Sequence, residues 1–108
     1  MILMAAPSSP SDLTATCVDG GTAPICEAEH VNFTGTGYPH NFDVEIDGVL
    51  DPLGFTAPRG NVNFTWPFSY DAVTPANNYH TVRILQAKGK DAGAELKSAT
   101  VEIIPFTP

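Results

Sequence analysis

The stretch VNFTGTGYPHNFDVEIDGV, Val31–Val49, contains two strand-like segments separated by a glycine-rich corner. After the corner, the segment Phe42–Gly48 alternates apolar and acidic residues, which is the period of a strand with one buried face. A glycine within a strand marks a bulge or a close backbone approach, and Pro39 cannot donate a hydrogen bond to a sheet. The stretch therefore predicts a strand that ends at Tyr38, a corner, and a second strand that begins at Phe42 in a facing sheet.

Segments of the same kind recur along the chain, each bounded by turn-forming residues. Ten prolines and nine glycines also suit many short strands joined by tight turns, and no convincing helical stripe is present. The helix-favouring segment KDAGAELKSA is interpreted as the loop between the last two strands. We therefore predict an all-β fold, an Ig-like (immunoglobulin-like) antiparallel β-sandwich of about seven strands. The expected strands are Leu13–Val18, Ile25–Gly35, Phe42–Gly48, Gly54–Ala57, Val62–Phe68, Tyr79–Ala87 and Ser98–Phe106.

The domain organisation follows from the length and from the proline-containing start. A chain of 108 residues fits a single domain. Residues 1–12 are predicted to form an extended N-terminal arm, and residues 13–108 the sandwich. Alternation within the strands predicts a core made of Phe33, Phe42, Val44, Ile46, Phe64, Trp66, Val82, Ile84, Val101 and Ile103.

The order of these segments resembles that of bacterial and bacteriophage immunoglobulin-like domains over roughly residues 30–104. Three short motifs carry the resemblance: a glycine-x-glycine-aromatic-proline corner, a turn that leads into an aromatic strand, and a strand of the form x-His-Thr-Val. Such modules bind or space other molecules and supply no catalytic residues. Residues 1–29 and the pair of cysteines depart from the pattern. The matching positions are Gly35, Gly37, Tyr38 and Pro39, then Gly60, Asn61, Val62, Asn63 and Phe64, then His80, Thr81 and Val82.

The net charge of −7 is concentrated in the first half of the chain, where residues 1–58 hold eight acidic residues and no lysine or arginine. No basic stripe is available to neutralise phosphates, so we expect no nucleic-acid partner. An anionic membrane surface is disfavoured for the same reason, and no apolar run approaches the roughly 20 residues of a membrane span. A basic partner surface would suit the acidic half, although the acids could serve solubility alone.

Cys17 and Cys26 are the only cysteines, and they flank a turn-forming segment as two strands of a hairpin would. Facing residues of a hairpin are close enough for a disulfide, and two ordinary buried thiols are the alternative. A disulfide would imply an oxidising final location.

The sequence offers few groups for metal or acid–base chemistry. We expect no metal and no cofactor, because two cysteines are too few ligands and the three histidines are not at ligand spacing. His80 is expected to be a hydrogen-bonded core residue. Asp43, Glu45 and Asp47 are expected to form a solvated row on one face of a strand.

No nucleophile motif or phosphate-binding loop is present in the sequence, so we expect no enzyme. We expect instead an accessory protein on the virion surface of a tailed bacteriophage, where it contacts neighbouring structural subunits of the capsid or tail. The alternative is an extracellular bacterial adhesion or spacer module, at the cell surface or secreted. Weak carbohydrate binding is a further alternative, which would need exposed aromatic residues drawn from Tyr38, Trp66, Phe68, Tyr70 and Tyr79.

The start of the chain is the candidate partner-binding segment. Met1, Ile2, Leu3 and Met4 are large and apolar, and no charge occurs before Asp12. Buried on a partner, each large apolar side chain could contribute roughly 1.5–3 kcal/mol before the cost of ordering the arm. A frayed terminus is the alternative.

Overall fold

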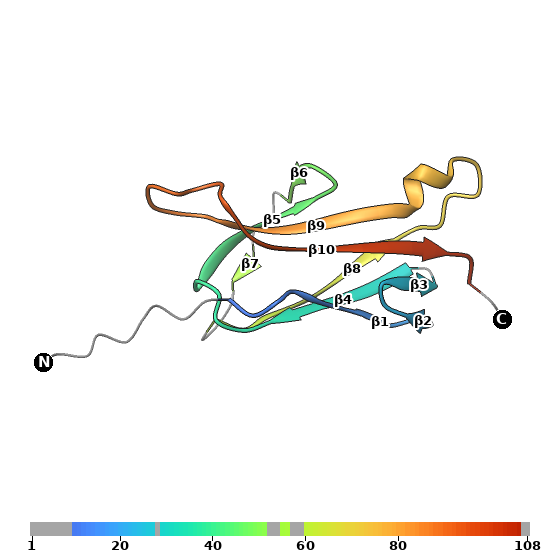
Figure 1. Cartoon of the computed structure of the whole chain (residues 1–108), viewed down its shortest axis with the longest axis horizontal. Helices are drawn as coiled ribbons and strands as arrows, with labels where there is room; N and C mark the ends of the chain where they lie inside the picture. The colour runs from blue at the N-terminus through green and yellow to red at the C-terminus, as the bar shows by residue number, and fades with distance from the viewer. Residues whose placement is uncertain (1–9, 28, 52–54, 57–59, 107–108) are drawn as a thin grey trace, which may run out of the picture.

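The computed structural model describes residues 10–27, 29–51, 55–56 and 60–106. These residues form ten strands and one short 3-10 helix, η2, and no α-helix occurs among them (Figure 1). The all-β prediction is confirmed, whereas the expected number of about seven strands is too low. The elements are β1 Thr14–Cys17, β2 Gly21–Thr22, β3 Ile25–Glu27, β4 Glu29–Gly35, β5 Asn41–Ile46, β6 Val49–Leu50, β7 Phe55–Thr56, β8 Val62–Phe68, η2 Pro75–Asn78, β9 Tyr79–Gln86 and β10 Glu95–Ile104.

The strands form two sheets that face each other as two layers (Figure 1). The smaller sheet is antiparallel and has the order β1-β4-β8. The larger sheet has the order β2-β3-β10-β9-β5-β6, with β7 also paired to β5. Its β3 runs parallel to β10, so the larger sheet is mixed rather than purely antiparallel.

Three differences account for the additional strands. The expected strand Ile25–Gly35 is divided into β3 in the larger sheet and β4 in the smaller one, so the chain changes sheets near residue 28. Asp47 and Gly48 have φ values of 51° and 85°, the positive values of a tight hairpin turn, and this turn adds β6. The short β2 pairs with β3 and also had no counterpart in the prediction.

The last strand begins earlier than expected, at Glu95, so the interpretation of KDAGAELKSA as loop is wrong for its second half. The weak helical preference of that segment gives way to pairing with β9, which continues across a register shift between Glu95 and Lys97. The β9–β10 connection therefore comprises residues 87–94.

The core lies between the two layers. Phe33 is fully buried at its centre, with its ring centroid 5.4 Å from that of Phe64 and 6.4 Å from that of Phe68. Eight of the ten residues predicted for the core are buried, and the other two, Ile46 and Trp66, are partly buried against it. The core also contains Leu13, Cys26, Val31, Tyr38, Val62 and Phe68.

The glycine-rich corner carries the chain from the smaller sheet to the larger one, as the sequence predicts, but β4 ends at Gly35 rather than at Tyr38. Tyr38 is buried, and its hydroxyl donates a hydrogen bond of 2.8 Å to the carbonyl oxygen of Ser11. Its backbone N–H donates to the carbonyl oxygen of Gly60 at 3.1 Å. Tyr38 therefore joins the start of the described chain, the corner and the loop before β8.

Candidate functional site

The sandwich has two ends (Figure 1). The end named here the hairpin end contains the β9–β10 connection, the Tyr38 corner and Pro10, where the described chain begins. The end named here the tail end contains the β2–β3 hairpin, η2, the beginning of β9 and the last residues of β10. Exposed side chains with a capacity for contact lie at both ends, and Val49 and Leu50 of β6 are exposed between them.

The tail end contains the disulfide between Cys17 and Cys26, whose Cα atoms are 5.2 Å apart. Cys17 belongs to β1 of the smaller sheet and Cys26 to β3 of the larger sheet, so the bond joins the two layers. The expectation that the two cysteines face each other across a hairpin was wrong, because the strand that pairs with β3 is β2, through Gly21 opposite Cys26.

Asp19 fastens the loop after β1 to the beginning of β4. Its Oδ2 accepts hydrogen bonds from the backbone N–H of Glu29 at 2.8 Å and of His30 at 2.9 Å, and it lies 2.9 Å from Nδ1 of His30. These contacts lower the pKa of Asp19 to about 2. The backbone N–H of Glu29 contributes most, followed by the backbone N–H of His30 and then by the His30 ring. A hollow beside this pair is lined by Val18 and Phe106.

Large apolar side chains are exposed at the tail end. Tyr79 is 57% exposed and Phe106 is 59% exposed, and Val18 and Ile25 are also largely in water. Ile25 and Tyr79 lie on either side of Glu102, because Glu102 is in register with both of them in the larger sheet. They line a second hollow together with Pro24, Thr100, Val101 and Glu102.

Three glutamates lie on the strands of the tail end, and two of them line the hollows, Glu29 with Val18 and Phe106 and Glu102 with Ile25 and Tyr79. Glu27 precedes the change of sheet, Glu29 begins β4, and Glu102 lies between Ile25 and Tyr79 in the larger sheet. None of the three carboxylates forms a salt bridge within the described ranges. The tail end therefore exposes both large apolar side chains and glutamates without a salt bridge to the described residues.

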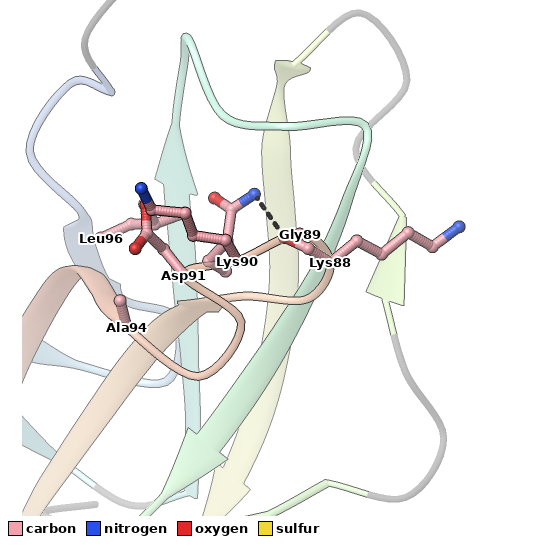
Figure 2. Close-up of a pocket in the computed structure, with 7 residues that line it drawn as sticks. Lys88, Gly89, Lys90, Asp91, Ala94 and Leu96 are labelled. Atoms are coloured by element: carbon pink, nitrogen blue, oxygen red, sulfur yellow. Dashed lines mark hydrogen bonds between the residues drawn. The ribbon is translucent and has the colours of Figure 1, made fainter.

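The hairpin end carries two lysines, Lys88 and Lys90, on the β9–β10 connection. Both are exposed, and neither forms a salt bridge to any residue that the structure describes. Figure 2 shows the hollow beside them, with the side chain of Lys88 extended away from the other lining residues and the amide of Gln86 bonded to the carbonyl oxygen of Lys88 at 3.1 Å. The other described basic residues are paired, Arg83 with two glutamates and Lys97 with Asp12.

The acidic row expected on β5 is only partly solvated. Glu45 accepts a hydrogen bond of 2.6 Å from Arg83, which also donates to Glu95 at 2.7 Å, and these two carboxylates raise the pKa of Arg83. Asp47 lies beyond the end of β5 in the hairpin turn, where its Oδ1 accepts the backbone N–H of Thr81 at 2.8 Å. The prediction of a solvated row is therefore only partly correct, because Glu45 and Asp47 bond to the neighbouring strand β9.

His80 is partly buried and hydrogen-bonded. Its Nδ1 lies 2.7 Å from Oδ2 of Asp47, and its ring stacks on Phe68 at a centroid distance of 4.4 Å. In the described part of the chain, no group of three or more histidine, cysteine, aspartate or glutamate side chains is placed to hold a metal ion. None of the described helices is long and apolar enough to span a membrane.

The remaining sequence-predicted residues fall into two groups. Met1, Ile2, Leu3 and Met4 lie outside the described residues. Of the aromatic residues proposed for carbohydrate binding, Tyr38 and Phe68 are buried and Trp66 is partly buried, so only Tyr70 and Tyr79 are exposed.

Sequence reasoning did not find the tail end as a site. The alternation of apolar and polar residues assigns Glu27, Glu29 and Glu102 only to strand surfaces, and the position of Glu102 beside Ile25 depends on the pairing of β3 with β10. Comparisons with protein-family models, with curated proteins and with solved structures found no match.

Proposed function

We propose that this chain is an immunoglobulin-like domain that attaches to other proteins without catalysing a reaction. The strand order carries the proposal. If β1, β4, β5, β8, β9 and β10 are the immunoglobulin strands A, B, C, E, F and G, the two sheets become A-B-E and G-F-C, as in that fold. The parallel β3, which lies between β1 and β4 in the chain, then pairs beside strand G at the edge of the second sheet.

The domain departs from antibody domains in its disulfide. There the bond joins strands B and F, whereas here it joins β1 and β3. The two arrangements share a purpose, because each links the two layers by a covalent bond. The strand order supports a relationship of fold, whereas the different disulfide gives no support to an immune-receptor function.

The setting that we propose is the virion of a tailed bacteriophage, where the domain would decorate the capsid or tail as a structural accessory. The support is the resemblance of residues 30–104 to bacterial and bacteriophage immunoglobulin-like domains, together with an exposed apolar surface suited to protein contacts. The neighbouring subunits of the particle would then be the partners.

A second candidate is an extracellular spacer or adhesion module of a bacterium. One observation favours it: Pro10 lines a hollow with Tyr38 at the hairpin end, whereas Phe106 lines a hollow with Asp19 at the tail end. Because these ends are opposite, domains of this kind could follow one another along a line (Figure 1). Carbohydrate binding is less favoured, because Tyr70 and Tyr79 are the only members of the predicted aromatic set that are exposed.

Mass spectrometry of fractions from the natural source separates these functions. Peptides of this chain in density-purified phage particles, at a fixed ratio to the main structural protein, would support the virion proposal. Their recovery only from the cell envelope or the medium, within a longer polypeptide, would overturn it in favour of the spacer. Retention of the purified chain on polysaccharide columns would instead support the carbohydrate-binding alternative.

A further inference from the structure

We propose that copies of this chain associate head to tail, with the lysines of the hairpin end of one copy seated on the acidic and apolar tail end of the next. The inference concerns contacts between identical chains and does not depend on the proposed virion function.

Charge complementarity is the first argument. At the hairpin end, Lys88 and Lys90 are exposed and without a salt bridge to the described residues, and with Asp91 beside them the β9–β10 connection keeps a net charge of +1. At the tail end, Glu27, Glu29 and Glu102 likewise lack such a salt bridge. Because the net charge is −7 and Arg83 and Lys97 are paired, these lysines are the described groups best suited to bring two copies together.

The apolar side chains at the tail end are the second argument. Ile25 and Tyr79 flank Glu102, so a lysine that reaches this carboxylate would lay its aliphatic stem across apolar surface. Leu96, in the hollow of the hairpin end, would supply an apolar group from the other copy. An aromatic and apolar centre with charges at its rim is the usual composition of a protein interface.

The geometry of the two ends is the third argument. The hairpin end and the tail end lie at opposite extremes of the sandwich, so using one leaves the other free (Figure 1). A contact between two different surfaces of identical chains is heterologous, and it produces rings or open filaments rather than closed two-fold dimers. Association should therefore continue beyond two copies as the concentration rises.

Sedimentation velocity of the purified full chain, over a range of concentrations at about 0.15 M salt, tests the proposal. The wild-type chain should sediment faster as the concentration rises. Lys88→Gln combined with Lys90→Gln should weaken this association by roughly tenfold or more. A matched control is Thr14→Glu combined with Thr65→Glu, which changes the net charge by the same −2 on exposed positions of the smaller sheet. The control should associate nearly as well as the wild type.

A charge-swap pair provides the decisive result. Lys88→Glu with Lys90→Glu should not associate alone, and neither should Glu29→Lys with Glu102→Lys, but a mixture of the two variants should assemble. Circular dichroism and the thermal midpoint check that each variant is folded. A wild-type chain that remains monomeric at all concentrations would overturn the proposal, as would folded swap variants that fail to assemble when mixed or that assemble alone.

Discussion

The ring of Tyr38 lies so close to Gly35 that a Cβ atom built on Gly35 would be only 2.6 Å from Cε2 of the tyrosine. The glycine is therefore required by the space that the buried tyrosine occupies, three residues later in the chain. The corner between the two sheets depends on this pair, and its sensitivity to substitution can be measured.

Gly35→Ala should lower the free energy of unfolding by about 1–3 kcal/mol, because the new methyl group forces the Tyr38 ring or the backbone to move. Tyr38→Phe keeps the ring and removes the hydrogen bond to Ser11, so its cost should be smaller, about 0.5–1.5 kcal/mol. Urea unfolding gives both values. Thr34→Ala, on the neighbouring residue, is the control, and a loss for Gly35→Ala no larger than the control's would contradict the steric argument.

Phe64→Ala should lower the free energy of unfolding by about 3–5 kcal/mol, because it removes a buried ring that packs on Phe33 and leaves a cavity. The measurement is chemical denaturation followed by tryptophan fluorescence. Thr65→Ala, at the next and exposed position of β8, should cost far less, because it removes only the hydroxyl that accepts a hydrogen bond from Asn32 at 3.1 Å. Equal effects of the two substitutions would argue against a core centred on these rings.

The Asp19 carboxylate should make the free energy of unfolding depend on pH in the acidic range. Its folded pKa of about 2 is below the unfolded value of 3.8, so its contribution is fully present above pH 5 and is lost as the pH falls towards 2. Asp19→Asn should therefore lower stability at pH 7 and flatten the decline between pH 5 and 2. Asp71, whose pKa is also lowered, mainly by Asn77, should retain part of that slope.

The measurement for Asp19 is the urea midpoint at a series of pH values. Asp91→Asn, on an exposed aspartate of the hairpin end, is the control and should leave the profile close to that of the wild type. An Asp19→Asn profile parallel to the wild type over the whole range would show that the carboxylate has no special role.

Cys17 and Cys26 should be found bonded to each other by mass spectrometry of non-reduced peptides. Replacing both by serine should cost about 2–3 kcal/mol, because the bond closes a short loop and restricts the unfolded chain. Free thiols in freshly isolated native protein would contradict this prediction and would weaken the proposed virion or extracellular setting.

The partner-binding role of Met1, Ile2, Leu3 and Met4 stays a prediction, and the structure indicates where to truncate. Ser11 donates its backbone N–H to the carbonyl oxygen of Thr36 and accepts the Tyr38 hydroxyl, so it should be retained. Deletion of residues 1–9 should leave the thermal midpoint nearly unchanged and reduce attachment to the natural partner. Attachment equal to that of the full chain would assign the contact to the sheets or loops.

The local alternation of apolar and polar residues predicted the bounds of some strands correctly and those of others incorrectly. The strand Val62–Phe68 matches its predicted bounds, because turn-forming residues flank a clear alternation. The sequence indicates an irregularity near Glu29, because the buried positions change from even-numbered Cys26 to odd-numbered Val31. The change of sheet was not predictable, because the partner of β3 is β10, more than seventy residues later. The same distant pairing places Glu102 beside Ile25, so the composition of the tail end could not be predicted from the sequence. Lys88 and Lys90, in contrast, lie in a segment that the sequence already predicts to connect two strands.

The inter-sheet disulfide also has a mechanical consequence. A pull applied between Pro10 and Phe106 would draw β1 and β10 in opposite directions along their lengths, because the chain enters at one end of the sandwich and leaves at the other (Figure 1). The parallel hydrogen bonds between β3 and β10 would then be loaded together in shear rather than broken one at a time. With Cys17 bonded to Cys26, residues 18–25 cannot lengthen under tension, so the load reaches β3 directly. The domain should therefore resist extension under force, and reduction of the Cys17–Cys26 disulfide should allow residues 18–25 to extend.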